Sequence, residues 1–122
     1  MQYALLIYGA HGASAEETQA DDGVFADWLA YTRALKVSGA LQTAEQLEGV
    51  DTATTVRLRG GERLLTDGPF IETKEHLLGF YLVDVPDLDT ALDWAARMPH
   101  IRHGTVEVRP LKRGTAWRTV LE

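Results

Sequence analysis

Four ionisable side chains fall within nine residues in the middle of the chain, between Asp67 and Glu75. The run reads Asp-Gly-Pro-Phe-Ile-Glu-Thr-Lys-Glu, and its glycine and proline predict a tight turn, called here the charged turn (residues 67–75). Carboxylates beside a lysine can perform general acid–base chemistry where burial shifts their pKa values. Asp67 and Glu72 are the candidate catalytic residues, and Phe70, Lys74 and Glu75 are candidate ligand contacts. The alternative is an ordinary surface ion pair of little energetic value.

Two further charged residues lie near the end of the chain. Glu107 and Arg109 alternate with Val106 and Val108, so we expect the valines to face the core and the charged pair to face away from it. An arginine placed in this way can bind a carboxylate or phosphate through two parallel hydrogen bonds. Both charged residues are candidate ligand contacts. The alternative is an ion pair with a carboxylate of the charged turn.

The four histidines give a weak metal signal. His100 and His103 have an H-x-x-H spacing, but a metal site needs three or four converging ligands. We expect a surface loop there, with no metal and no cofactor, and we treat His76 as a pH-sensitive neighbour of the charged turn. The pair Gly60-Gly61 lacks the Lys-Ser/Thr of a phosphate-binding loop, and no nucleophilic serine elbow occurs.

The hydrophobic pattern predicts the elements that position these residues. Strands are expected at 2–8, 40–47, 54–59, 62–66, 79–85 and 105–110, and Gly60-Gly61 is expected to close a hairpin. Apolar residues at helical spacing from Val24 to Leu35 predict a helix that Gly39 ends. Asp87 is expected to cap a second helix, which Pro99 ends. The apolar face of that helix is predicted to comprise Leu88, Ala91, Leu92 and Ala95. Ser14 and Glu17 have capping-box spacing for a further helical turn.

This order of elements predicts an α+β fold. The pattern is the ferredoxin-like, split βαβ arrangement with an added β-hairpin, in which two helices cover one face of an antiparallel sheet. The first strand has apolar residues on both of its faces, so the uncovered face of the sheet needs a partner. We therefore expect a homodimer in which two sheets face each other.

Composition limits the class of protein. The chain has 122 residues, 45% hydrophobic and 25% charged, which is typical of one globular domain. It contains no cysteine, which excludes disulfides, thiolate metal sites and a cysteine nucleophile. The start lacks the features of a signal peptide, and no apolar run is long enough to span a membrane, so we expect a cytoplasmic location and no membrane partner.

The net charge of −6 is unevenly distributed. Residues 101–122 carry a local net charge of +3, so residues 1–100 carry −9. An acidic body repels phosphate backbones, and the short basic tail is interrupted by Gly and Thr, so nucleic acid is not an expected partner.

The charged turn, followed by Gly79-Phe80, closely resembles the signature of the YCII-related proteins of the DGPF-domain type. The opening Tyr3-Ala4-Leu5-Leu6-Ile7-Tyr8, the Ser38-Gly39-Ala40-Leu41 turn, Asp87-Leu88-Asp89 and the closing Glu107-Val108-Arg109-Pro110 are also similar to that family. The similarity predicts a YCII-related domain over residues 1–111 and a C-terminal tail over 112–122.

The resemblance implies a dimeric α+β barrel and little about activity. The founding branch of the family carries a histidine on its first helix, about eleven residues before the glycine that ends it. That position is Trp28 here, so the active site proposed for that branch does not carry over. Some members occur alongside extracytoplasmic-function sigma factors.

Three functional hypotheses follow. The first is a small-molecule-binding homodimer, with enzymatic activity left open, in which Lys74 and Arg109 neutralise a small anionic ligand. The second is a non-enzymatic accessory or regulatory protein associated with an extracytoplasmic-function sigma factor. The third is a charged turn that only locks the fold and the dimer. Because ferredoxin-like dimers host many functions, the fold alone does not decide among them.

Overall fold

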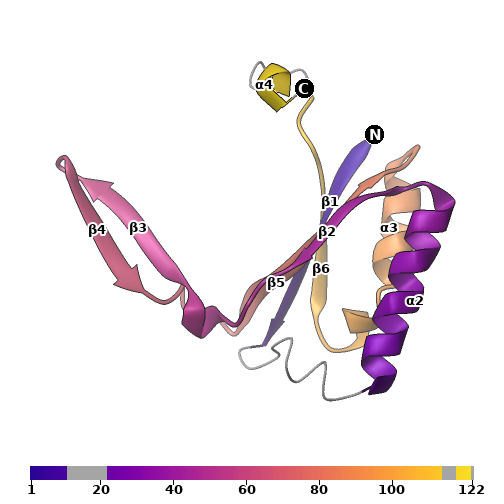
Figure 1. Cartoon of the computed structure of the whole chain (residues 1–122), viewed down its shortest axis with the longest axis horizontal. Coiled ribbons are helices and arrows are strands. Elements are labelled where there is room, and N and C mark those ends of the chain that lie inside the picture. Colours follow the sequence, from indigo (N-terminus) through magenta and orange to yellow (C-terminus); the bar gives the residue numbers. More distant parts are fainter. Residues whose placement is uncertain (11–21, 114–117, 122) are drawn as a thin grey trace.

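A four-stranded sheet with two helices on one face forms the body of the protein, and a β-hairpin projects from it (Figure 1). The computed structural model describes residues 1–10, 22–113 and 118–121. The expected capping box at Ser14 and Glu17 lies outside these residues. The elements are β1 (Gln2–Ala10), α2 (Asp22–Ser38), β2 (Leu41–Gln46), a 3₁₀ turn (Val50–Thr52), β3 (Thr54–Arg59), β4 (Glu62–Asp67), β5 (Glu75–Asp84), α3 (Leu88–Ala96), a second 3₁₀ turn (Pro99–Arg102), β6 (Thr105–Pro110) and α4 (Arg118–Leu121).

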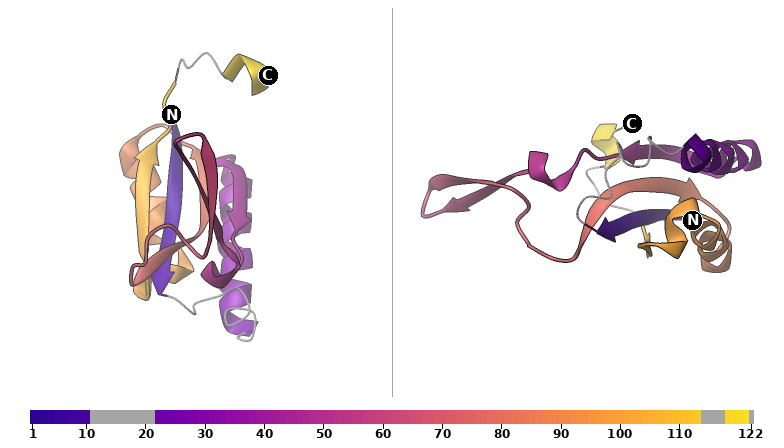
Figure 2. Two further views of the ribbon diagram at one scale, coloured as in Figure 1. Left: turned by 90° about the vertical axis from the view of Figure 1, so that its left-hand side faces the viewer. Right: turned by 90° about the horizontal axis from the view of Figure 1, so that it is seen from below.

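The strand order is β2-β5-β1-β6, and every neighbouring pair is antiparallel. Helices α2 and α3 lie side by side on one face of this sheet (Figure 2). This is the ferredoxin-like arrangement that the order of elements predicts, and the added hairpin forms a separate two-stranded sheet of β3 and β4. The predicted α+β fold class is confirmed. None of the described helices is long and apolar enough to cross a membrane.

Strand β1 lies at the centre of the sheet and is apolar on both faces. Tyr3, Leu5 and Ile7 point to the helices and are buried in the core. Ala4, Leu6 and Tyr8 point to the other face, which we call the open face because no described helix covers it. As expected, Val106 and Val108 of β6 pack against the core, so Glu107 and Arg109 lie on the open face.

An aromatic cluster joins the two helices to the sheet. The Trp28 ring stacks on Tyr81 with centroids 6.1 Å apart, and Tyr31 makes edge-to-face contacts with Tyr81 and Trp94. The Tyr31 hydroxyl donates a 2.8 Å hydrogen bond to the carbonyl of Trp94. Burial raises the pKa of the Tyr31 phenol, and the neighbouring Tyr81 raises it further. The cluster thus combines apolar packing with a satisfied polar contact between α2 and α3.

The helices are less buried than their sequence pattern predicts. In α2 the core contacts come from Trp28, Tyr31 and Leu35, while Phe25 and Leu29 are largely exposed. In α3 the prediction is wrong for Leu88 and Leu92, which are exposed, whereas Ala91 and Ala95 are buried as predicted and Trp94 is buried with them. Each helix contacts the sheet along a narrow stripe of residues. The other apolar side chains of the two helices lie beside this stripe and remain exposed.

Strand β5 is longer than predicted. It begins at Glu75 rather than at residue 79, because Glu75–Leu77 pair with the end of β1 beyond a bulge between Ile7 and Tyr8. Leu78 is the extra residue in this bulge, and its carbonyl accepts a 2.8 Å hydrogen bond from the Leu47 amide. The bulge therefore ties the chain that follows β2 to the same end of the sheet.

The N-terminus of α3 yields a test by pH. The Asp87 carboxylate accepts hydrogen bonds from the Thr90 hydroxyl and amide, which lower the Asp87 pKa from its ordinary value of 3.8. This stabilisation is present above pH 3.8 and is lost as the pH falls through the lowered folded-state pKa. Asp87→Ala should lower the Tm at pH 7 by a few degrees, and the difference from the wild type should shrink in strong acid. Asp87→Asn keeps the cap without the charge and serves as the control. An Ala variant with an unchanged Tm at pH 7 would rule the cap out.

Candidate functional site

The charged turn connects the end of β4 to the start of β5 and is anchored on the chain before β3. Gly68 has φ +100°, a left-handed conformation that glycine adopts without strain. Its amide donates a 2.7 Å hydrogen bond to the Ala53 carbonyl, and its carbonyl accepts one of the same length from the Thr55 hydroxyl. The Thr73 hydroxyl donates to the carbonyl of Glu75. Backbone geometry thus sets the course of the turn, as its Gly-Pro sequence predicts.

A cavity of about 680 Å³ lies where the charged turn, the end of the sheet and the chain before β3 meet. We call it the hairpin-base cavity. Most of its lining is apolar, and its polar lining residues include Tyr8, Glu48, Thr73 and Glu75. The lining residues are Tyr8, Leu47, Glu48, Gly49, Val50, Thr52, Ala53, Thr55, Pro69, Phe70, Ile71, Thr73, Glu75, His76 and Leu77.

The predicted site residues of the charged turn do not all reach this cavity. Phe70 and Glu75 line it, whereas Asp67, Glu72 and Lys74 are exposed and line neither of the two hollows described here. Glu75 Oε1 accepts a long hydrogen bond of 3.5 Å from the Thr105 hydroxyl of β6. Lys74 forms no ion pair within 4.0 Å with any described residue, so the alternative of a surface ion pair at Lys74 is not supported. Glu75 is therefore the one charged-turn carboxylate that the structure places at a concave surface among the described residues.

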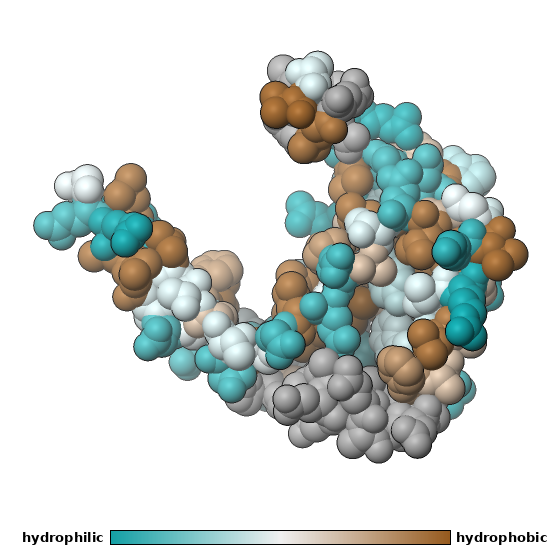
Figure 3. Space-filling view, in the orientation of Figure 1, coloured by the Kyte–Doolittle hydropathy of each residue, from teal (hydrophilic) through white to brown (hydrophobic). Residues whose placement is uncertain are grey.

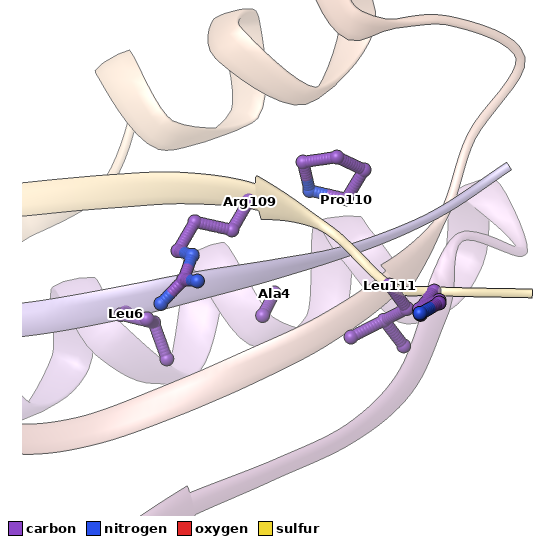
Figure 4. A pocket seen from close by; sticks show the side chains of 6 residues that line it. Ala4, Leu6, Arg109, Pro110 and Leu111 are labelled. Atoms are coloured by element: carbon purple, nitrogen blue, oxygen red, sulfur yellow. The ribbon is translucent and has the colours of Figure 1, made fainter.

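Arg109 lies in a second, smaller hollow on the open face. This hollow has a volume of about 320 Å³ and is lined by Ala4, Leu6, Arg109, Pro110, Leu111 and Lys112. In Figure 4 the Arg109 side chain extends along the sheet towards Leu6. Two cations and no carboxylate line this Arg109 hollow, so its electrostatics favour an anionic group. Glu107 lies on the same face beside Leu6 but lines neither hollow.

The two hollows adjoin each other along β1. Leu6 lines the Arg109 hollow and Tyr8 lines the hairpin-base cavity, and both side chains point to the open face. Residues two apart on one strand face lie about 7 Å from each other. One ligand of modest length can therefore contact both hollows.

Nothing in the sequence alone marks residues 47–55 as part of the site. The structure places them there because β2 pairs with β5 and Leu47 bonds to the Leu78 bulge. The signal that could have found them is this strand pairing, which brings the end of the 40–47 strand to the start of the central strand.

His100 has a structural contact that its sequence context does not predict. Its Nε2 lies 3.0 Å from the Tyr8 carbonyl oxygen and donates to it in the tautomer protonated on that nitrogen. The ring fits against the bare backbone of Gly9 and Gly104. Within the described residues, no group of three His, Asp or Glu side chains could hold a metal ion.

The comparisons with known proteins identify the family. The profile of the YCII-related domain matches residues 1–115. The chain belongs to the YCII-related family. The resemblance of its charged turn to that family is thereby confirmed, although Trp28 of this YCII-related protein belongs to the aromatic cluster instead of supplying a histidine.

Two similar proteins give further context. An uncharacterized protein of Rhizobium meliloti is 41% identical over 114 residues, covering 91% of this chain and 92% of that protein. The YCII-related chain also shares its fold with 5-chloro-2-hydroxyhydroquinone dehydrochlorinase from Burkholderia phenoliruptrix, whose structure contains 2,5-dihydroxybenzoquinone. The TM-score is 0.52 with 15% identity, over 93% of this chain and 96% of that one. This second likeness is one of fold alone.

The contact between His100 and β1 predicts a sensitive glycine. A Cβ atom on Gly104 would lie against His100 Nε2 and 2.5 Å from the Tyr8 carbonyl oxygen. Gly104→Ala should destabilise the protein by about 1–3 kcal/mol because both contacts are overpacked. Adding His100→Ala should restore only part of the loss, since the Tyr8 carbonyl remains in the way. Arg102→Ala, close by in the chain and exposed, is the control for chemical denaturation. Equal midpoints for Gly104→Ala and the wild type would refute this packing.

Proposed function

We propose that this YCII-related protein is a small-molecule-binding homodimer whose ligand occupies the hairpin-base cavity and the adjoining Arg109 hollow. The observation that carries the proposal is the cavity itself. Its volume of about 680 Å³ is in the range of pockets for small organic ligands. Its largely apolar lining with a few polar groups is also typical of such pockets.

The dimer part of the proposal rests on the open face. Leu6, Tyr8, Phe80 and Leu82 are only partly buried there and form a continuous apolar surface across β1 and β5. A surface of this kind on a small protein marks an interaction site, and a second copy with the same face is its simplest partner. The two sheets would then face each other around the ligand.

The chemistry of the two hollows suggests the class of ligand. Arg109 and Lys112 favour a carboxylate or phosphate, while Phe70 and Tyr8 provide aromatic surface for an organic body. Tyr8 offers a hydroxyl group to a hydroxyl or carbonyl oxygen, and the Thr73 hydroxyl, which donates to Glu75, can accept from a ligand hydroxyl. A small organic acid with an oxygen-bearing ring matches this arrangement. The dehydrochlorinase that shares the fold supports the choice, because its structure contains an oxygenated six-membered ring compound.

Enzymatic activity is the second part of the proposal. Glu75 lines the cavity and is the best-placed carboxylate for proton transfer. Asp67 and Glu72 remain candidate acid–base residues on either side of the Phe70 segment, and Lys74 remains a candidate for neutralising an anionic substrate. That a protein of the same fold is an enzyme supports this part.

Ligand binding is tested by a thermal-shift screen with organic acids and phosphate esters, because a ligand that binds only the folded state raises the Tm. For a compound that raises the Tm, Arg109→Gln should weaken binding about 10- to 100-fold, the value of a charged hydrogen bond. Arg33→Gln on the exposed surface of α2 is the matched control and should bind as the wild type does. Isothermal titration gives both affinities. Equal affinities for Arg109→Gln and the wild type would remove Arg109 from the site.

Catalysis is tested on the same compounds by following their turnover with purified protein. Glu75→Gln should lower kcat by about 100-fold or more if the carboxylate transfers a proton. Asp67→Asn and Glu72→Gln are measured in parallel, and Asp93→Asn on α3 is the control. Binding without turnover would leave a binding protein. Turnover that none of the three variants changes would refute the proposed role of these carboxylates.

A further inference from the structure

The β3–β4 hairpin exposes an apolar face that no described part of its own chain covers. Val56, Leu58 and Leu65 lie on one side of it, since Val56 pairs with Leu65 and successive residues of a strand alternate. Their exposed fractions are 60%, 65% and 58%. A two-stranded hairpin is marginally stable by itself and needs a surface on which to pack.

The hairpin stands away from the sheet of its own chain. It projects on the open-face side, and a wide gap separates its tip from β1 (Figures 1 and 2). The space-filling view shows this gap as a deep hollow with apolar residues on both of its walls (Figure 3). Gly60 and Gly61, both with positive φ, form the tight turn at the tip and keep the two strands paired to their ends.

The open face carries a pattern that complements this hairpin. The strand register places Glu45, Phe80, Leu6 and Glu107 in one row across β2, β5, β1 and β6. We call these four residues the cross-sheet row. Two apolar side chains occupy its centre and a carboxylate lies at each end.

The hairpin face has the matching charge. Arg63 pairs with Leu58 and lies on the same side as Val56 and Leu65. The apolar side chains fit the centre of the cross-sheet row, and the arginine fits a carboxylate at its end. The same side of the hairpin also carries Asp67, which pairs with Thr54, so the hairpin and the row match in hydrophobicity and, at the Arg63 end, in charge.

We propose that the β3–β4 hairpin is an exchanged arm, which packs its Val56–Leu58–Leu65 face on the cross-sheet row of a second copy. The inference rests on the homodimer of the proposed function and specifies how that dimer is held. Because a two-fold axis makes the exchange reciprocal, each open face receives the other copy's hairpin, and the two hairpins lie between the facing sheets. The arm also covers the Arg109 hollow, so the ligand site is complete only in the dimer.

The lack of cysteine in this chain allows a direct test. One preparation carries a single cysteine on the hairpin (Val56→Cys, Leu58→Cys or Leu65→Cys), and another carries Leu6→Cys or Phe80→Cys. The two are mixed, refolded together and oxidised. Disulfides form only where Cα atoms approach to within about 7 Å. Arg57→Cys, on the opposite side of the hairpin, is the matched control.

We expect at least one hairpin–sheet combination to give a covalent heterodimer on a non-reducing gel and the Arg57→Cys control to give none. Light scattering on the wild type separates the two proposals. A wild-type dimer without any such cross-link overturns the exchanged arm and leaves the homodimer standing. A wild type that is monomeric at all concentrations overturns both.

A charge reversal provides the second, independent variant. Arg63 is exposed in the single chain, so Arg63→Glu should fold normally while raising the dimer dissociation constant about tenfold or more through like-charge repulsion. Combining it with Glu45→Arg or Glu107→Arg should restore the dimer in one of the two cases. An unchanged dissociation constant for Arg63→Glu would contradict the proposed contact.

Discussion

The central strand β1 has apolar side chains on both faces, and this constraint organises the whole molecule. One face is satisfied within the chain, because Tyr3, Leu5 and Ile7 pack beneath the two helices. The other face, with Ala4, Leu6 and Tyr8, has no helix among the described residues. An apolar strand at the centre of a sheet stabilises a fold only when both sides leave water. The requirement for a cover on the second side therefore arises from the same strand that supplies Tyr3, Leu5 and Ile7 to the core.

The ligand site and the dimer interface both follow from that uncovered side. The Arg109 hollow and the hairpin-base cavity are arranged along β1, and they share its outward-facing residues Leu6 and Tyr8. A second copy that covers the open face also removes these hollows from bulk water. Electrostatic contacts to a ligand strengthen when water is excluded, so association and ligand binding are expected to favour each other.

The fold could be predicted from the sequence because its strong signals are local. Alternation in β3 and β6, the Gly60-Gly61 turn and the cap at Asp87 each depend on neighbouring residues, and the structure confirms them. The exposure of Leu88 and Leu92 could not be predicted, because helical periodicity shows which residues share a face but not how much of that face the sheet covers. The domain boundary between residues 111 and 112 remains a prediction.

The candidate site was harder to predict, since its parts meet only through strand pairing. The cluster of charges in the charged turn favoured Asp67, Glu72 and Lys74 as site residues, but these three lie outside the hollows. The residues that do line the cavity include ordinary apolar ones such as Leu47 and Val50, which no motif marks. Their position depends on the register between β2 and β5 and on the bulge at Leu78, neither of which is encoded by residue type.

The pairing of β5 with the end of β1 makes the site depend on chain length as much as on residue identity. Beyond the bulge at Leu78, Leu77 pairs with Tyr8 and Glu75 with Ala10, so Glu75 lies on the same face as Tyr8. Side chains alternate along a strand, so a chain shorter by one residue between Glu75 and Leu77 would direct the carboxylate towards the helices. Related chains could therefore retain every residue of the charged turn and still lose the carboxylate from the cavity through a single deletion. Alignment of the residues around position 78 is thus a more sensitive indicator of a shared site than the turn motif itself.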